Sequence, residues 1–170
     1  MKYLLFILLL LIFTENYGQA EEYSNKRTLN SFAQGNDILS LSGVFNTNNN
    51  TMGSAFFCEH FIKDGFSYTY GITGYISDPD LVWFDINQSL KGYITHYKIR
   101  PFVEARYSTL FSEQGITLNI GASAGVSYSE IIDDFGLEIS YNYITPFVNF
   151  SDIESPYNMQ TIRVAIYYQW

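Results

Sequence analysis

Six charged residues interrupt segments in which every second residue is apolar. They are Asp85, Lys91, Glu104, Arg106, Glu138 and Arg163. Because both signs are present, these side chains can form ion pairs, and a row of such pairs in a low-dielectric interior can also carry protons or ions. We expect them to form one charge network. Glu59 is a further candidate if its segment turns that side inward.

The segments that carry these charges have the period of β-strands, in which successive side chains point to opposite faces. Eight such segments occur, at 37–46, 54–62, 66–76, 81–94, 101–112, 116–130, 135–145 and 158–170. No helical period of useful length appears after the first 20 residues. The sequence therefore predicts an all-β fold with eight antiparallel strands. Segment 54–62 has aromatic residues on both faces, so its facing is left open.

Composition restricts the classes of function. Charged residues make up 15% of the chain, against about 25% in an average soluble protein, and aromatic residues make up 18%. The formal net charge is −8. This excess of acidic groups argues against nucleic-acid binding, which needs clustered Lys and Arg to neutralise phosphates.

The first 20 residues have the pattern of a secretory signal peptide. Lys2 precedes an apolar run at 3–13, and Gly18 and Ala20 are small residues at a plausible cleavage point. The run is too short to span a bilayer as a helix, which takes about 20 apolar residues. We expect a signal peptide at 1–20, a flexible periplasmic lead-in at 21–36 and one β-barrel at 37–170. The single cysteine, Cys58, excludes a disulfide framework.

The polar faces of the strands indicate which side is the outside. They consist mostly of Ser, Thr, Gly and Asn, which fit the narrow lumen of an eight-stranded barrel better than a water-facing surface. Several segments are also long enough, at ten residues or more, for a tilted strand to cross a bilayer. We therefore predict an up-and-down transmembrane β-barrel. In segment 116–130 the small inward residues are expected to leave room for Arg106, Glu138 and Arg163.

Four stretches carry a resemblance to a known family: "EHFIKDGFSYTYGITGY", "PFVEARYS", "IGASAGVSYSEIIDDFGLEISYNY" and the final strand. Together they resemble the outer-membrane β-barrel domain family, that is, the small OmpA- and OmpX-like barrels of Bacteroidetes-type bacteria. The resemblance implies that Tyr168 and Trp170 form a C-terminal insertion signal for the barrel-assembly machinery. It also implies a location in the bacterial cell outer membrane.

These observations lead to the expectation of a small, monomeric outer-membrane barrel with a plugged polar lumen. Its role would be structural or one of surface interaction, its partners would be outer-membrane lipid and lipopolysaccharide, and no cofactor, metal or catalytic residue is expected. One alternative is a secreted soluble lipocalin-like barrel that binds an apolar ligand. Another is a lipid A-modifying enzyme, which would need His60 or His96 beside a serine at the outer leaflet. If the mature N-terminus lies in the periplasm, both histidines are expected at the periplasmic rim, away from the outer leaflet.

Overall fold

The computed structural model describes residues 35–78, 81–94, 98–112, 115–132, 134–150 and 158–170. The predicted signal peptide and nearly all of the predicted lead-in lie outside these residues. No helix within the described ranges is long and apolar enough to cross a membrane.

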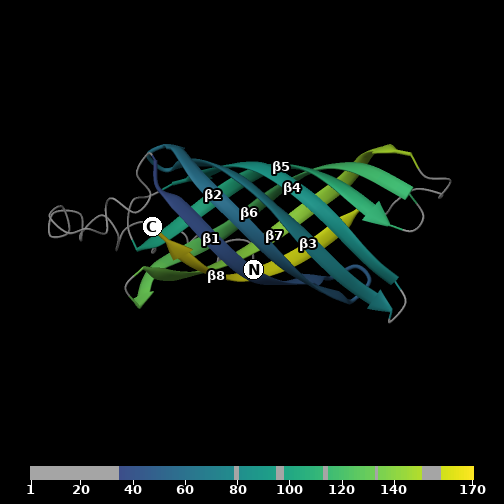
Figure 1. Ribbon diagram of the computed structural model, residues 1–170, viewed down its shortest axis with the longest axis horizontal. Helices are drawn as coiled ribbons and strands as arrows, with labels where there is room; N and C mark the ends of the chain where they lie inside the picture. Colours follow the sequence, from purple (N-terminus) through teal and green to yellow (C-terminus); the bar gives the residue numbers. More distant parts are fainter. Residues whose placement is uncertain (1–34, 79–80, 95–97, 113–114, 133, 151–157) are drawn as a thin grey trace, which may run out of the picture.

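The chain folds into eight antiparallel strands that close into a barrel (Figure 1). Their bounds are β1 Asp37–Asn46, β2 Thr51–Lys63, β3 Phe66–Asp78, β4 Leu81–Tyr93, β5 Ile99–Ser112, β6 Gly115–Ile132, β7 Phe135–Asn149 and β8 Met159–Gln169. Each strand pairs with its neighbours in sequence, and β1 pairs with β8 to close the sheet. This confirms the predicted eight-stranded up-and-down topology. Closure leaves no sheet edge to be satisfied by water along the paired strands.

Two tight turns show how the chain reverses between strands. Gly65 has a φ of 69° in the turn between β2 and β3, and Asn50 has a φ of 57° between β1 and β2. Glycine and asparagine tolerate this left-handed backbone best. We call the end of the barrel with Asp37, Gly65 and Trp170 the terminal end, and the end with Asn50 the distal end.

Some strands are longer than the alternation predicted. β2 begins at Thr51, so the first connection is shorter than the Asn-rich stretch suggested. β7 continues to Asn149, through Pro146, which was expected to begin a loop. The register of β6 against β7 shifts between Leu118 and Asn119, opposite Pro146, and this irregularity accommodates a residue that cannot donate to the ladder.

At the terminal end, pairing begins slightly before β1. The backbone N–H of Gly35 donates to the Phe61 carbonyl at 2.8 Å, and the N–H of Phe61 donates to the Asn36 carbonyl at 3.0 Å. The last two residues of the predicted lead-in are therefore held against β2.

Side-chain burial follows the strand alternation, with the apolar side chains outside. In β8, Val164 and Ile166 are 51% and 58% exposed, whereas the intervening Arg163 and Ala165 are buried. Most of the inward-facing side chains that are buried are polar or charged, in contrast to the apolar outer face. A soluble barrel with an apolar ligand site would need the reverse arrangement, so this alternative is not favoured.

The facing of β2 is now settled. Phe57, Glu59 and Phe61 point into the barrel, whereas Phe56 and His60 point outward. Two adjacent aromatic residues on opposite faces had concealed the alternation in the sequence.

Interior aromatic rings pack over glycines on the neighbouring strand. Phe57 faces Gly71, and Phe102 faces Gly125, in both cases as direct cross-strand partners. A Cβ atom built on either glycine would overlap the ring. The expectation that the small residues of β6 leave room for charged side chains is therefore wrong at Gly125, because Phe102 of the adjacent strand fills that space.

Candidate functional site: the charged lumen

Charged side chains from five strands form a continuous series of ion pairs inside the barrel, with acidic and basic groups in alternation. The series runs Glu59, Lys91, Glu138, Arg163, Glu104 and Arg106. We call these six residues the lumen network. All of them are at most 7% exposed. Three acids and three bases make the network electrically neutral at pH 7.

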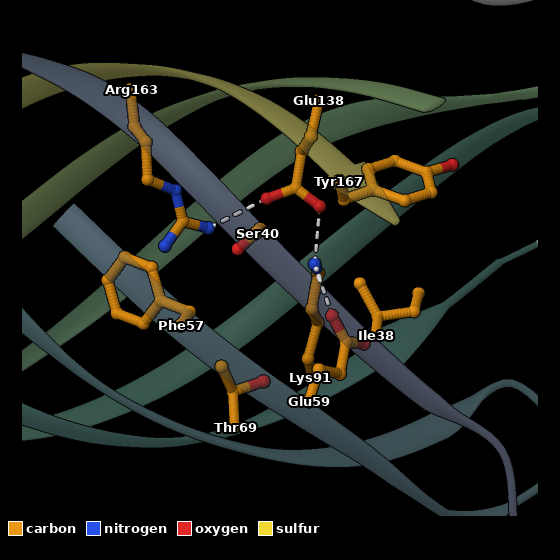
Figure 2. Close-up of a pocket in the computed structure, with 9 residues that line it drawn as sticks. All are labelled: Ile38, Ser40, Phe57, Glu59, Thr69, Lys91, Glu138, Arg163 and Tyr167. Atoms are coloured by element: carbon orange, nitrogen blue, oxygen red, sulfur yellow. Dashed lines mark hydrogen bonds and ion pairs between the residues drawn. The ribbon is translucent and has the colours of Figure 1, made fainter. Parts of the chain in front are cut away.

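The five N–O distances along the series range from 2.5 to 3.4 Å. Nζ of Lys91 lies 3.1 Å from Oε2 of Glu59 and 2.5 Å from Oε2 of Glu138. Nη2 of Arg163 lies 2.8 Å from Oε1 of Glu138 and 3.4 Å from Oε2 of Glu104. Figure 2 shows Glu138 between the two cations, with one carboxylate oxygen directed to each. Burial of these charges is therefore compensated by their mutual attraction.

Hydroxyl groups complete the hydrogen bonding of Glu59. The Ser67 hydroxyl donates to Oε1 of Glu59 at 2.5 Å, and the Tyr93 hydroxyl donates to the same atom at 2.9 Å. Both carboxylate oxygens of Glu59 are thus satisfied once Lys91 is included. Glu59 is therefore a full member of the network, which its position in an ambiguous strand had hidden.

Aromatic faces cover the cations. Nζ of Lys91 lies 4.2 Å from the centroid of the Phe102 ring, and the Arg163 guanidinium lies 4.7 Å from the Phe57 ring. Such cation–π contacts are strongest where the cation has lost its water. The same rings that pack over Gly71 and Gly125 thus also line the network.

A small cavity adjoins the network, with Glu59, Lys91, Glu138 and Arg163 among its lining residues. Its volume is about 10 Å³, which corresponds to room for about one water molecule. Ser40 and Thr69 also line the cavity and carry hydroxyl groups that could hydrogen-bond to such a water (Figure 2).

Asp85 is separate from the lumen network. Its side chain is completely buried, yet it forms no salt bridge with any residue in the described parts of the chain. Neither of its carboxylate oxygens has a hydrogen bond of good geometry to a described residue. Of the six charged residues singled out in the sequence, the structure brings five together and leaves Asp85 apart.

Arg100 is a buried cation that the sequence analysis did not select. It is 1% exposed and points into the barrel from β5, two positions before Phe102. The alternation of β5 places it on the same face as Glu104 and Arg106, and this parity was the available signal. Arg100 was not selected because it falls between the predicted segments 81–94 and 101–112, where a turn is expected.

His60 lies outside the barrel, at the terminal end. Its Nδ1 is 2.6 Å from Oδ1 of Asp37, and both side chains are partly exposed. The second histidine, His96, lies outside the described residues. Among the described residues no group of three or more His, Cys, Asp or Glu side chains could hold a metal ion.

Tyr168 and Trp170 belong to an aromatic cluster on the outside of the terminal end. Their rings are stacked with centroids 5.9 Å apart, and Tyr168 also contacts Phe135 at 5.1 Å. Trp170 is 58% exposed. Aromatic side chains in this position are typical of the girdle at a membrane interface. Their service as an insertion signal stays a prediction.

Three solved structures of β-barrels have a fold similar to that of this chain. The N-terminal β-barrel domain of OprF from Pseudomonas aeruginosa has a TM-score of 0.64 at 10% identity, over 81% of this chain and 98% of that one. Neisserial surface protein A has a TM-score of 0.61 at 12% identity, over 79% of this chain and 95% of that one. A de novo designed transmembrane β-barrel has a TM-score of 0.57 at 16% identity, over 81% and 97%. No protein-family model and no curated protein sequence matches the chain.

The closed eight-stranded sheet, the apolar exterior and these neighbours together define an up-and-down transmembrane β-barrel. The resemblance read from the sequence holds at the level of this fold. The narrower OmpA- and OmpX-like, Bacteroidetes-type assignment stays a prediction.

Proposed function

We propose that this protein is a small barrel of the bacterial outer membrane with a lumen closed by the lumen network, and that its role is structural or one of surface interaction rather than catalytic. The observation that carries the proposal is the unbroken series of ion pairs from Glu59 to Arg106. Six charged groups held by each other and by aromatic rings resist displacement, because removal of one leaves another buried without a partner. Their mutual pairing favours a closed interior over an open aqueous channel.

An outer-membrane location is supported by the apolar exterior and the even number of antiparallel strands, both typical of outer-membrane barrels. In this setting the exterior would contact outer-membrane lipid and lipopolysaccharide. With the terminal end in the periplasm, the connection at 47–50 would face outward. Cell fractionation tests the location, together with gel migration of the unheated and heated protein. Recovery in the outer-membrane fraction with heat-dependent migration is expected, and recovery in the aqueous fraction would contradict it.

The closed lumen is tested by solute exclusion. Vesicles that contain the purified, folded protein are placed in an isotonic solution of a small sugar, and their swelling is followed by light scattering. We expect no more swelling than in protein-free vesicles, because ion pairs occupy the path of the solute. Swelling at the rate of an open porin would contradict the closed lumen.

A further inference from the structure

On the outer face of the described strands, one amide side chain lies at mid-strand, where a membrane protein is expected to be apolar. Gln88 points outward and is exposed, with seven residues of β4 before it and five after it (Leu81–Tyr93). The other outward amide or charged side chains in the described parts of the strands are Asp37, His60, Lys63 and Gln160, and each lies within four residues of a strand end. Gln88 is thus at the depth of the hydrocarbon, not at an interface.

The amide of Gln88 makes no hydrogen bond to another described residue. Lipid tails offer neither donors nor acceptors, so an unpaired amide at this depth is costly. The neighbouring outward positions are Tyr70 on β3 and Tyr107 on β5, which are direct cross-strand partners of Gln88 and are 51% and 40% exposed. Gln88 therefore stands between two tyrosines, in a patch with hydrogen-bonding capacity on an otherwise apolar wall.

We propose that Gln88 is the centre of a contact between two copies of this barrel in the membrane, through reciprocal hydrogen bonds between the two Gln88 amides. A primary amide is both donor and acceptor, so it is complementary to itself across a two-fold axis. The Gln88 amide of each copy then forms hydrogen bonds to the amide of the other copy, so no other kind of protein is needed as a partner. This contact goes beyond the proposed closed-barrel function and replaces the expectation of a monomer.

Strand tilt limits the contact to a small area. Strands of transmembrane barrels tilt by about 35–45° from the membrane normal, so two β4 strands related by a two-fold axis along that normal cross at about 70–90°. Only residues at the crossing point then touch. With Gln88 at the crossing, the outward side chains around it are Ile86 and Leu90 on the same strand and Tyr70 and Tyr107 beside it. Hydrogen bonding at the centre of such a contact supplies specificity that apolar packing alone lacks in lipid.

Energy transfer in vesicles tests the contact. Donor and acceptor dyes are attached at Asp64→Cys, in the turn at the terminal end, on a Cys58→Ala background, which adds no polar group beside Tyr70, and transfer is measured against the protein-to-lipid ratio. We expect association of this labelled parent and a dissociation constant about tenfold higher for Gln88→Leu, the scale of the loss of a pair of membrane hydrogen bonds. Gln88→Asn should keep part of the association. Ser54→Ala, which removes another outward polar group, should leave it unchanged.

Heat-dependent gel migration verifies that each variant is folded. Cross-linking with a flexible bis-maleimide, which bridges cysteines too far apart for a disulfide, then locates the surface. Leu90→Cys on the Cys58→Ala background should give covalent dimers, and Val164→Cys, on β8 at the opposite wall, should not. If energy transfer in the labelled parent is no greater than expected for randomly distributed barrels at every protein-to-lipid ratio, the proposal is overturned. Equal association of the parent and Gln88→Leu, or cross-linking through Val164→Cys alone, would overturn it as well.

Discussion

Lys91 and Glu138, from strands β4 and β7, meet inside the barrel with Nζ 2.5 Å from Oε2. These strands are not neighbours in the sheet, so their contact spans the lumen rather than following the wall. Lys91 also holds Glu59 of β2. One ammonium group thus connects three strands that the backbone ladder does not join directly.

The Lys91 contact predicts a large loss of stability for Lys91→Met, which keeps the length of the side chain and removes its charge. Glu59 and Glu138 would then be buried without their shared cation. We expect the free energy of unfolding to fall by about 3–5 kcal/mol, as for other broken buried pairs. Urea titration of the protein in lipid vesicles measures the change. Lys63→Met, in an exposed position at the end of β2, is the matched control and should change it by less than about 0.5 kcal/mol.

Substitution of Asp85 should have the opposite effect on the free energy of unfolding. Because its buried carboxylate forms no salt bridge with a described residue, Asp85→Asn removes a buried charge whose desolvation outweighs the attraction of Arg106, and it should leave stability unchanged or raise it. Glu104→Gln, an equally conservative change, should cost about 3 kcal/mol because it weakens the pairing of Arg106 and Arg163. The same urea titration compares the two variants. Equal losses would show that Asp85 is held by partners as strong as those of Glu104.

The packing of Phe57 over Gly71 predicts that Gly71→Ala is destabilising. The added methyl group would overlap the Phe57 ring and the Phe56 carbonyl oxygen, at a cost of about 1–3 kcal/mol for an overpacked interior. Gly74→Ala is the control on the same strand, since it faces outward and meets nothing within 4 Å. We expect no loss there. A loss of similar size at both positions would point to the backbone rather than to the ring.

An arginine scan tests the outer face. Val164, at the middle of β8, is 51% exposed, and Ile62, near the end of β2, is 45% exposed. On a soluble surface, arginine would be accepted equally at both. In a bilayer we expect Val164→Arg to cost about 2–4 kcal/mol and Ile62→Arg about 0–1 kcal/mol, because the penalty falls toward the interface. Equal small effects in vesicles would show that the apolar wall does not face lipid.

Much of the fold could be predicted from alternation alone. A two-residue period specifies strands, and small polar residues opposite apolar ones specify which face is inside, as in β6 and β8. The prediction failed where the alternation is absent, at Phe56 and Phe57. There the inward face is set by a ring that packs over Gly71 on the next strand, and this relation depends on a register that a single strand does not reveal.

The charged site was predictable as a set but not as a pattern of contacts. The parity of each strand places Glu104, Arg106 and Arg163 inside. Which of them meet depends on the tilt and stagger of strands across the lumen. For that reason nothing in the local sequence distinguishes Asp85, which forms no ion pair with a described residue, from Glu138, which forms two.

Ion conductance in planar lipid bilayers tests the closed lumen most directly. The protein with its lumen network intact should give at most small conductance steps at neutral pH. Arg163→Ala removes the cation shared by Glu104 and Glu138 and shortens a side chain that fills the lumen, so its conductance should rise clearly above that of the parent. Large, stable steps in the parent, or identical traces for the parent and Arg163→Ala, would contradict a lumen closed by these ion pairs.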